Sequence, residues 1–93
     1  MSPMSRCSAT AKITNKRGLH ARASAKLVEA ASRFKSHITV GKDGQCVDAR
    51  SIMGLMLLIA PIGTEVEISA AGEDAQEALG AILALIEAKF GEE

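Results

Sequence analysis

The sequence predicts an α+β fold in two layers, in which helices cover one face of a β-sheet. Apolar residues alternate with polar ones in four stretches, which is typical of half-buried strands. Two other stretches carry apolar residues at helical spacing, and a short apolar segment lies between them. The order of these elements is β-α-β-β-α-β-α within 93 residues, and this order favours one sheet with its helices on one side.

The first half of the chain begins with a strand over residues 7–14, where Cys7, Ala9, Ala11 and Ile13 alternate with polar residues. Residues 15–18 are turn-forming types. From Ala21 the period changes, and an apolar stripe that ends at Phe34 predicts the first helix. A second strand over 37–40, a hairpin turn at Asp43-Gly44 and a third strand over 45–49 follow.

The second half begins with a short helix over residues 51–58, for which Ser51 is the expected N-cap. Residues 65–70 alternate again and predict the fourth strand. The last helix runs over 74–90, where Asp74 and Glu77 resemble a capping box and Gly91 suits a left-handed end. If the fourth strand lies between the first and second, the sheet order is 1-4-2-3, although periodicity alone leaves this order open.

Size and composition limit the class of protein. We expect residues 1–93 to form a single domain, with a loose N-terminus over residues 1–6. The N-terminal residues lack the apolar centre of a signal peptide, and the longest apolar run, residues 52–62, is short of the ~20 needed to cross a bilayer. Two cysteines form neither a metal motif nor a disulfide framework. We therefore expect a cytoplasmic protein with no membrane insertion and reduced thiols.

The charge is balanced overall but divided along the chain. The formal net charge is zero, yet residues 1–50 hold ten basic and three acidic residues, while residues 51–93 hold one basic and eight acidic residues. Aromatic residues make up only 2% of the chain, which argues against the stacking platforms that bind single-stranded nucleic acid. We expect no nucleic-acid partner, and the basic half suggests acidic partners or phosphate.

The segment from Gly18 to Ala25 carries the most chemical information. His20 lies where a loop becomes a helix, and the free N–H groups of a helix N-terminus attract anions. Arg22, two residues later, has a guanidinium that forks onto phosphate oxygens. A neutral imidazole is a nucleophile near neutral pH, so this pattern indicates a phosphoryl-accepting histidine. The sequence shows no carboxylate pair, metal cluster or cofactor motif, and we expect no metal and no cofactor.

Two segments together resemble HPr, the histidine-containing phosphocarrier family of the bacterial phosphoenolpyruvate-dependent phosphotransferase system. Residues 18–25 look like its phosphorylation signature, and residues 50–58 resemble its regulatory serine signature. The resemblance implies an open-faced β-sandwich with sheet order 1-4-2-3. It also implies a monomeric carrier rather than an enzyme, which accepts a phosphoryl group from enzyme I on Nδ1 of His20, beside Arg22, and passes it to an enzyme IIA-type domain.

The resemblance implies further roles for the second signature. Ser51 would be a phosphorylation site for an HPr kinase/phosphorylase, and we expect Arg50 to lie close enough to share the added charge. The short helix has too many apolar residues to bury them all. We expect Leu55 and Leu58 in the core and an exposed partner-docking surface on this helix and the first one, made of Ala21, Ala25, Ile52, Met53 and Met56.

The chain departs from the family pattern at several positions. Ala23 stands where many members have proline, and Ile59 stands where many have glycine after the second signature. Ala21 replaces a common hydroxyl residue, and Glu29 and Ser32 replace lysines that often surround the docking face.

Two other functions stay open at this stage. The chain could be a regulatory binding protein that acts mainly through Ser51 phosphorylation, in a nitrogen-related branch rather than in sugar uptake. It could also be a small ligand- or RNA-binding module, which the scarcity of aromatic residues disfavours.

Overall fold

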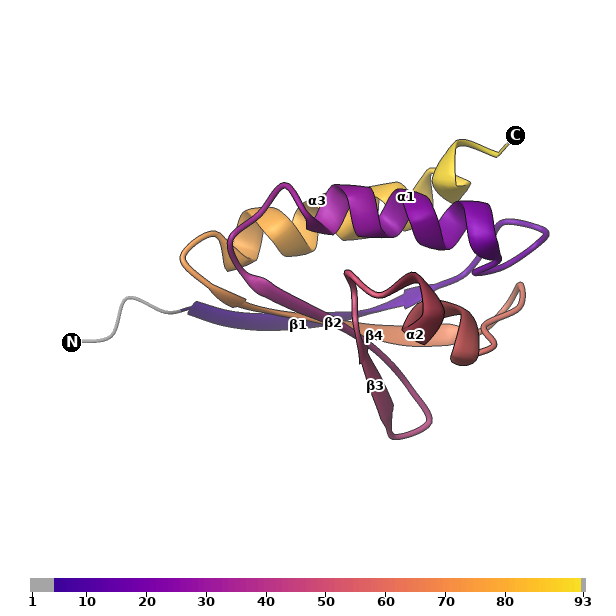
Figure 1. Cartoon of the computed structure of the whole chain (residues 1–93), viewed down its shortest axis with the longest axis horizontal. Coiled ribbons are helices and arrows are strands. Elements are labelled where there is room, and N and C mark those ends of the chain that lie inside the picture. The colour runs from indigo at the N-terminus through magenta and orange to yellow at the C-terminus, as the bar shows by residue number, and fades with distance from the viewer. Residues whose placement is uncertain (1–4, 93) are drawn as a thin grey trace.

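The computed structural model describes residues 5–92 and shows helices packed over one side of a sheet (Figure 1). The elements match the predicted order, with a short 3₁₀ turn added at the end. They are β1 (Ser5–Lys12), α1 (Ala21–Ala31), β2 (His37–Lys42), β3 (Gln45–Asp48), α2 (Ile52–Leu57), β4 (Glu65–Gly72), α3 (Ala75–Glu87) and η1 (Lys89–Gly91).

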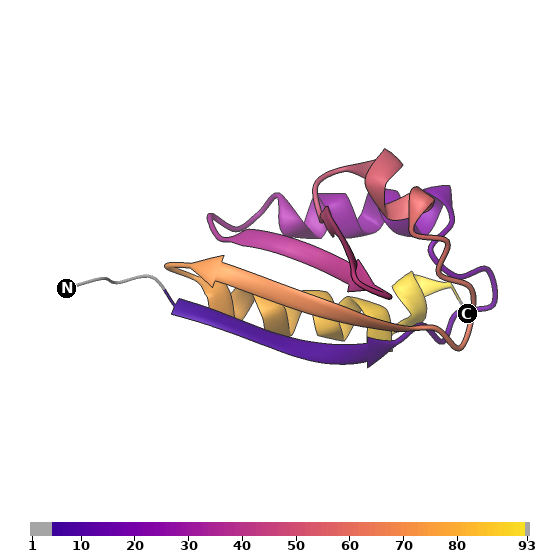
Figure 2. The ribbon, with the colours of Figure 1, turned by 90° about the horizontal axis from the view of Figure 1, so that it is seen from below.

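The four strands form one antiparallel sheet in the order β1-β4-β2-β3, which confirms the order 1-4-2-3 (Figure 2). The register places Cys7 of β1 and Ile38 of β2 on either side of Ala70 of β4. β4 therefore lies in the middle of the sheet, and every second residue of its centre faces the helices. Val66, Ile68 and Ala70 are all buried there.

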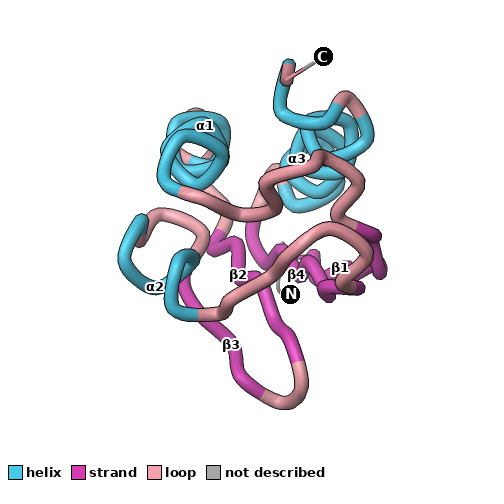
Figure 3. The backbone as a smooth tube through the Cα atoms, turned by 90° about the vertical axis from the view of Figure 1, so that its right-hand side faces the viewer, coloured by secondary structure: helices cyan, strands magenta, loops and turns pink. Residues whose placement is uncertain are grey.

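The core lies between the sheet and the helices α1 and α3, which run side by side above it (Figure 3). Leu27 of α1 and Ile82 of α3 are completely buried between the two layers. α2 lies to one side, beside α1 and near β3, and Leu55 and Leu58 join its end to the core, as expected. Burial of such aliphatic side chains supplies about 1.5–3 kcal/mol each, so each element is held by its apolar face.

The boundaries differ from the sequence prediction in places. β1 begins at Ser5, so residues 5 and 6 are not a loose terminus, while residues 1–4 lie outside the described part. α1 ends at Ala31 rather than near Phe34. α3 ends at Glu87, because the backbone of residues 89–91 turns left-handed instead of continuing the helix.

The predicted capping box at Asp74 is wrong. Asp74 occupies the N-cap position of α3 but its side chain makes no capping bond. Its carboxylate instead accepts hydrogen bonds from the backbone amides of Lys35 and Ser36, both at 2.9 Å, and from the Ser36 hydroxyl at 2.5 Å. Asp74 therefore ties the loop before β2 to the start of α3.

Both thiols are free in this structure. Cys7 is on β1 and Cys46 is on β3, which are the two outer strands of the sheet. Neighbouring strands are about 4.8 Å apart, so the two cysteines are too far apart to form a disulfide. Among residues 5–92, no helix is long and apolar enough to cross a membrane.

Candidate functional site

A tight turn between β1 and α1 sets the position of His20. Gly18 has a φ of 67°, a left-handed conformation that favours glycine. A Cβ atom at Gly18 would also collide with the backbone of Ala60 and Pro61. The amide of Leu19 then donates to the carbonyl oxygen of Ala60 at 3.0 Å. The turn is thus fixed against the segment that follows α2, and His20 comes directly after it.

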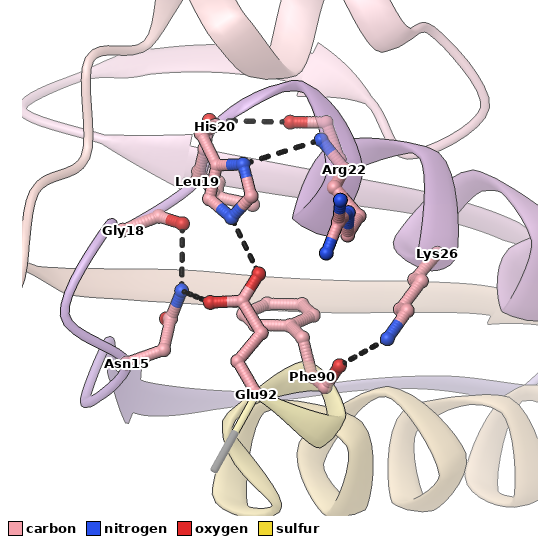
Figure 4. A network of polar contacts seen from close by, with 9 residues as sticks. Asn15, Gly18, Leu19, His20, Arg22, Lys26, Phe90 and Glu92 are labelled. Atoms are coloured by element: carbon pink, nitrogen blue, oxygen red, sulfur yellow. Dashed lines mark hydrogen bonds and ion pairs between the residues drawn. The ribbon is translucent and has the colours of Figure 1, made fainter.

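His20 is the N-cap residue of α1, and its own ring acts as the cap. The Nδ1 atom accepts a hydrogen bond from the backbone amide of Arg22 at 3.3 Å (Figure 4). The first backbone bond within the helix runs from the Ser24 amide to the carbonyl oxygen of His20. The backbone amides before Ser24 have no carbonyl partner within the helix, so they give this end of α1 a partial positive charge. Nδ1 lies at the positive end of a helix of 11 residues.

Four cationic side chains gather beside this helix end. A shallow hollow is lined by Lys16, Arg17, Arg22, Lys26, Gly91 and Glu92. Four positive charges and one carboxylate leave the hollow with a net positive charge, which favours an anion such as a phosphoryl group. The structure thus brings His20 and Arg22 together as the sequence predicted, and it adds Lys26 to the same place.

Asn15 and Glu92 are part of this arrangement and were missed at the level of sequence. Glu92 Oε2 lies 2.5 Å from Nε2 of His20, and its Oε1 accepts from Nδ2 of Asn15 at 3.0 Å. Asn15 is completely buried and also donates to the carbonyl oxygen of Gly18 at 2.8 Å. No periodicity or motif marks Glu92, because its contact with His20 spans 72 positions and depends on how the chain turns after α3.

The surroundings of Glu92 keep its carboxylate charged. The hydrogen bond from Asn15 lowers its pKa most, the contact with His20 and the charge of Lys26 lower it further, and partial burial opposes these effects. The net result is a pKa below the ordinary value of 4.5. At neutral pH the side chain is therefore an acceptor only.

Ser51 caps α2 as predicted. Its hydroxyl oxygen accepts from the Gly54 amide at 3.0 Å. The Arg50 guanidinium is directed elsewhere. Its Nη2 atom lies 2.5 Å from the carbonyl oxygen of Phe34, in the loop after α1, and 3.4 Å from that of Ala31, the last residue of α1. Without a phosphate on Ser51, the Arg50 guanidinium is therefore not directed to Ser51 as expected, but binds backbone carbonyl oxygens at the end of α1 and in the loop after it.

An apolar surface continues from α2 toward His20. We call it the α2 surface, and it consists of exposed side chains of α2 and the segment after it: Ile52, Met53, Met56, Leu57, Ile59 and Ile62. Met56 and Ile59 line a second shallow hollow together with His20. Ala21 and Ala25 are exposed on α1, so the residues predicted to dock partners all lie at the surface.

The described residues 5–92 contain no group of three or more histidine, cysteine or acidic side chains that could hold a metal ion. The groups that the structure brings together in this region are the His20 imidazole, the N-terminal end of α1, the basic side chains and the Glu92 carboxylate. The arrangement suits transfer of an anionic group onto and off the ring.

Comparisons with known proteins agree with this chemistry. Residues 7–88 match the family model "PTS HPr component phosphorylation site". Phosphocarrier protein HPr from Cupriavidus necator is 54% identical over 80 residues, covering 86% of this chain and 90% of the relative. The crystal structure of HPr-C-His from Thermoanaerobacter tengcongensis has a TM-score of 0.90 and 50% identity, covering 94% and 98% of the two chains.

A further relative carries a regulatory name. The solution structure of Crh, the Bacillus subtilis catabolite repression HPr, has a TM-score of 0.64 and 45% identity, covering 86% of this chain and 95% of that one. Family model, curated relatives and solved structures all cover most of this chain. The chain belongs to the HPr family, the phosphocarrier proteins of the bacterial phosphotransferase system.

Proposed function

We propose that His20 accepts a phosphoryl group from phospho-enzyme I on Nδ1 and passes it to an enzyme IIA-type domain. The observation that carries this proposal is the position of Nδ1, which lies at the N-terminal end of α1 and 3.3 Å from the Arg22 amide. The cationic hollow with Arg22 and Lys26 is next to it. The helix end and these charges together favour an anion on this nitrogen.

The covalent step uses one nucleophile from the chain, the His20 imidazole. The lone pair of Nδ1 attacks phosphorus, and the bond between phosphorus and the donor breaks, so that its electron pair returns to the donor. The Arg22 amide, which donates to Nδ1 in the free protein, is then in place to donate to a phosphoryl oxygen, and the Arg22 guanidinium adds charge. These interactions are electrostatic and reversible, which suits a carrier that must release the group again.

The surface around His20 fits partners that are both acidic and apolar. The α2 surface supplies exposed apolar area, with Met53 exposed to 72% and Leu57 to 70%. The cationic hollow supplies the positive charge beside it. Methionine adapts its shape to different partners, and a carrier must bind a donor and an acceptor in turn. Enzyme I and an enzyme IIA-type domain are the partners that we propose for this combined surface.

Ser51 supports a regulatory role alongside the carrier function. A phosphate on its hydroxyl would lie at the start of α2, next to the α2 surface, where its charge would oppose an acidic partner. The relative named a catabolite repression HPr makes regulation a reasonable second function for this chain. We propose an HPr kinase/phosphorylase as the enzyme that would modify Ser51.

The carrier function is tested by incubating the chain with enzyme I, Mg²⁺ and phosphoenolpyruvate and measuring the intact mass. We expect one added phosphoryl group that is lost in acid and retained in base, as a phosphoramidate behaves. His20→Ala should abolish it. His37→Ala is the matched control, since His37 is exposed on β2, and this variant should be phosphorylated normally. An acid-labile group that persists in His20→Ala would overturn the assignment.

A further inference from the structure

The backbone that precedes Glu92 adopts a costly conformation. Lys89, Phe90 and Gly91 have φ values of 58°, 55° and 75°, so three successive residues are left-handed. Only glycine adopts this region freely, and each other residue there costs about 1–2 kcal/mol. Such strain persists where the surrounding structure enforces it, and it gathers at functional sites.

Two contacts hold this turn in place. The Phe90 side chain is completely buried in the core. Lys26 Nζ donates to the carbonyl oxygen of Phe90 at 2.6 Å, so a side chain of α1 is hydrogen-bonded directly to the backbone of the turn (Figure 4). The turn is therefore anchored on both its side chain and its backbone. The consequence of this anchoring is that Glu92 emerges toward His20 instead of toward solvent.

Glu92 and the helix end together decide which ring nitrogen of His20 carries the proton. A carboxylate can only accept, so a hydrogen bond at 2.5 Å between Glu92 Oε2 and Nε2 requires the proton on Nε2. The Arg22 amide can only donate, so its contact with Nδ1 requires a lone pair there. Both contacts select the same tautomer, with the proton on Nε2 and the nucleophilic lone pair on Nδ1.

Resting on the proposed carrier function, we propose that Glu92 is a positioning residue that holds His20 in the Nε2–H tautomer and thereby directs the phosphoryl group to Nδ1. Asn15 in turn holds the carboxylate of Glu92 in position. Its Nδ2 atom donates to Glu92 Oε1 and to the Gly18 carbonyl oxygen, and these two acceptors fix the orientation of its amide. The carboxylate is thus held from behind by a buried side chain while it faces the ring.

The same pair balances charge during transfer. When Nδ1 forms its bond to phosphorus, the Nε2 proton stays in place and the ring gains a positive charge. Glu92 faces that charge directly and stabilises the ring cation. On delivery the Nδ1–phosphorus bond breaks, its electron pair returns to Nδ1, and the ring is again neutral. Neither direction moves a proton to or from the ring.

Glu92→Gln tests the role of Glu92 in selecting the tautomer, because the hydrogen bond from Asn15 determines the orientation of the new side-chain amide. The Nδ2 group of Asn15 needs an acceptor, so the glutamine oxygen turns to Asn15 and its NH₂ group turns to Nε2 of His20. An NH₂ group donates, which would require a lone pair on Nε2 and a proton on Nδ1. We therefore expect this variant to shift the ring toward the Nδ1–H tautomer, although the side chain keeps its size.

The readout is the ¹⁵N NMR spectrum of the His20 ring at mildly alkaline pH, in which the two tautomers give different shifts. The wild type should be dominated by Nε2–H. Glu92→Gln should hold a clearly larger share of Nδ1–H, although the Arg22 amide still favours a lone pair on Nδ1, and Glu92→Ala should lie between them. Transfer from enzyme I to Glu92→Gln should be slower by about tenfold or more, since a wrong tautomer must first be corrected. Glu87→Gln removes the same charge from an exposed position on α3 and should match the wild type.

The two proposals fail in different ways. If the wild type accepts a phosphoryl group on His20 but Glu92→Gln and Glu92→Ala keep its tautomer ratio and its transfer rate, the role of Glu92 is refuted while the carrier function stands. If the wild type itself accepts nothing on His20, the carrier function is refuted. The tautomer measurement needs no partner protein, so it tests the role of Glu92 in either case.

Discussion

Lys26 on α1 donates a hydrogen bond of 2.6 Å from Nζ to the carbonyl oxygen of Phe90, 64 positions further along the chain. This bond joins α1, the helix that His20 caps, to the left-handed turn that positions Glu92. The two sides of the site are thus coupled through α1. A substitution of Lys26 should therefore change the mobility of the backbone at Glu92, although His20 itself is unchanged.

We predict that Lys26→Met loosens the turn while the fold persists. The variant keeps the aliphatic stem but loses a charged donor, so the free energy of unfolding should fall by about 1–2 kcal/mol. Hydrogen exchange of the Gly91 and Glu92 amides should accelerate. Lys35→Met is the control, because the contact of the Lys35 side chain is a long, exposed ion pair with Glu73 of little energetic value, and the Lys35 amide that binds Asp74 is kept. Unchanged exchange at both amides in Lys26→Met would show that the bond does not hold the turn.

Ile59 is predicted to be a strained position that glycine would relieve. It has a φ of 53°, which a β-branched residue adopts at a cost of about 1–2 kcal/mol, and its side chain is exposed to 70%. Ile59→Gly should raise the free energy of unfolding by about 1 kcal/mol, partly offset by the greater freedom of unfolded glycine.

Chemical denaturation of Ile59→Gly and Ile62→Gly measures this effect. Ile62 is also exposed, but its φ is not positive, so glycine there should give no stabilisation. Equal destabilisation by both substitutions would contradict the strain at Ile59.

The sequence predicted the fold well because its signals were local and repeated. Alternation in β4 and the apolar stripes of α1 and α3 each depend on spacing within one element, and the resemblance to HPr supplied the sheet order. The position of His20 at the start of α1 was predictable for the same reason, since a change of period marks the beginning of the helix.

The parts that were missed depend on contacts between distant segments. Asp74 was predicted to cap its own helix, but its carboxylate accepts hydrogen bonds from the amides of residues 35 and 36 instead. Arg50 was assigned to its neighbour Ser51, but it reaches the end of α1. Glu92 lacks any pattern, because only a left-handed turn after α3 brings it to the ring. In each case a polar side chain had several possible partners, and packing chose among them.

Low pH should reduce the free energy of unfolding partly by protonating the carboxylate of Asp74. Its pKa is lowered below the ordinary value of 3.8, most strongly by the Ser36 hydroxyl and then by the Lys35 amide, against some opposing effect of burial. The native state therefore favours the charged carboxylate. Its stabilising contribution is present above the unfolded-state pKa and is lost as pH falls through the lower native value.

We predict that the loss of unfolding free energy between about pH 6 and about pH 2.5 is smaller in Asp74→Asn than in the wild type. Denaturant titrations at the two pH values measure the difference. Glu73→Gln, at the adjacent exposed position, should lose as much as the wild type. If Asp74→Asn also shows the full acid loss, Asp74 does not carry this pH dependence.

A negative charge at Ser51 should slow phosphoryl transfer without unfolding the chain. Aspartate caps a helix about as well as serine, so Ser51→Asp should melt close to the wild type. Its charge next to the α2 surface should repel an acidic partner, and this effect should shrink as salt rises. Ser51→Asn is the matched control, since it caps without charge and should accept phosphate from enzyme I at the wild-type rate. If Ser51→Asp and Ser51→Asn transfer equally fast at low salt, Ser51 is only a cap.

The central claim, that this chain carries a phosphoryl group from one protein to another on His20, is tested most directly by a chase. The chain is phosphorylated by enzyme I with labelled phosphoenolpyruvate, purified away from both, and mixed with an enzyme IIA-type domain. The phosphocarrier protein HPr from Cupriavidus necator serves as the reference donor. We predict that the label leaves His20 and appears on the IIA-type domain, and that His20→Ala never becomes labelled. Label that stays on the chain, or appears only as free phosphate, while the reference protein delivers to the same domain, would contradict the account.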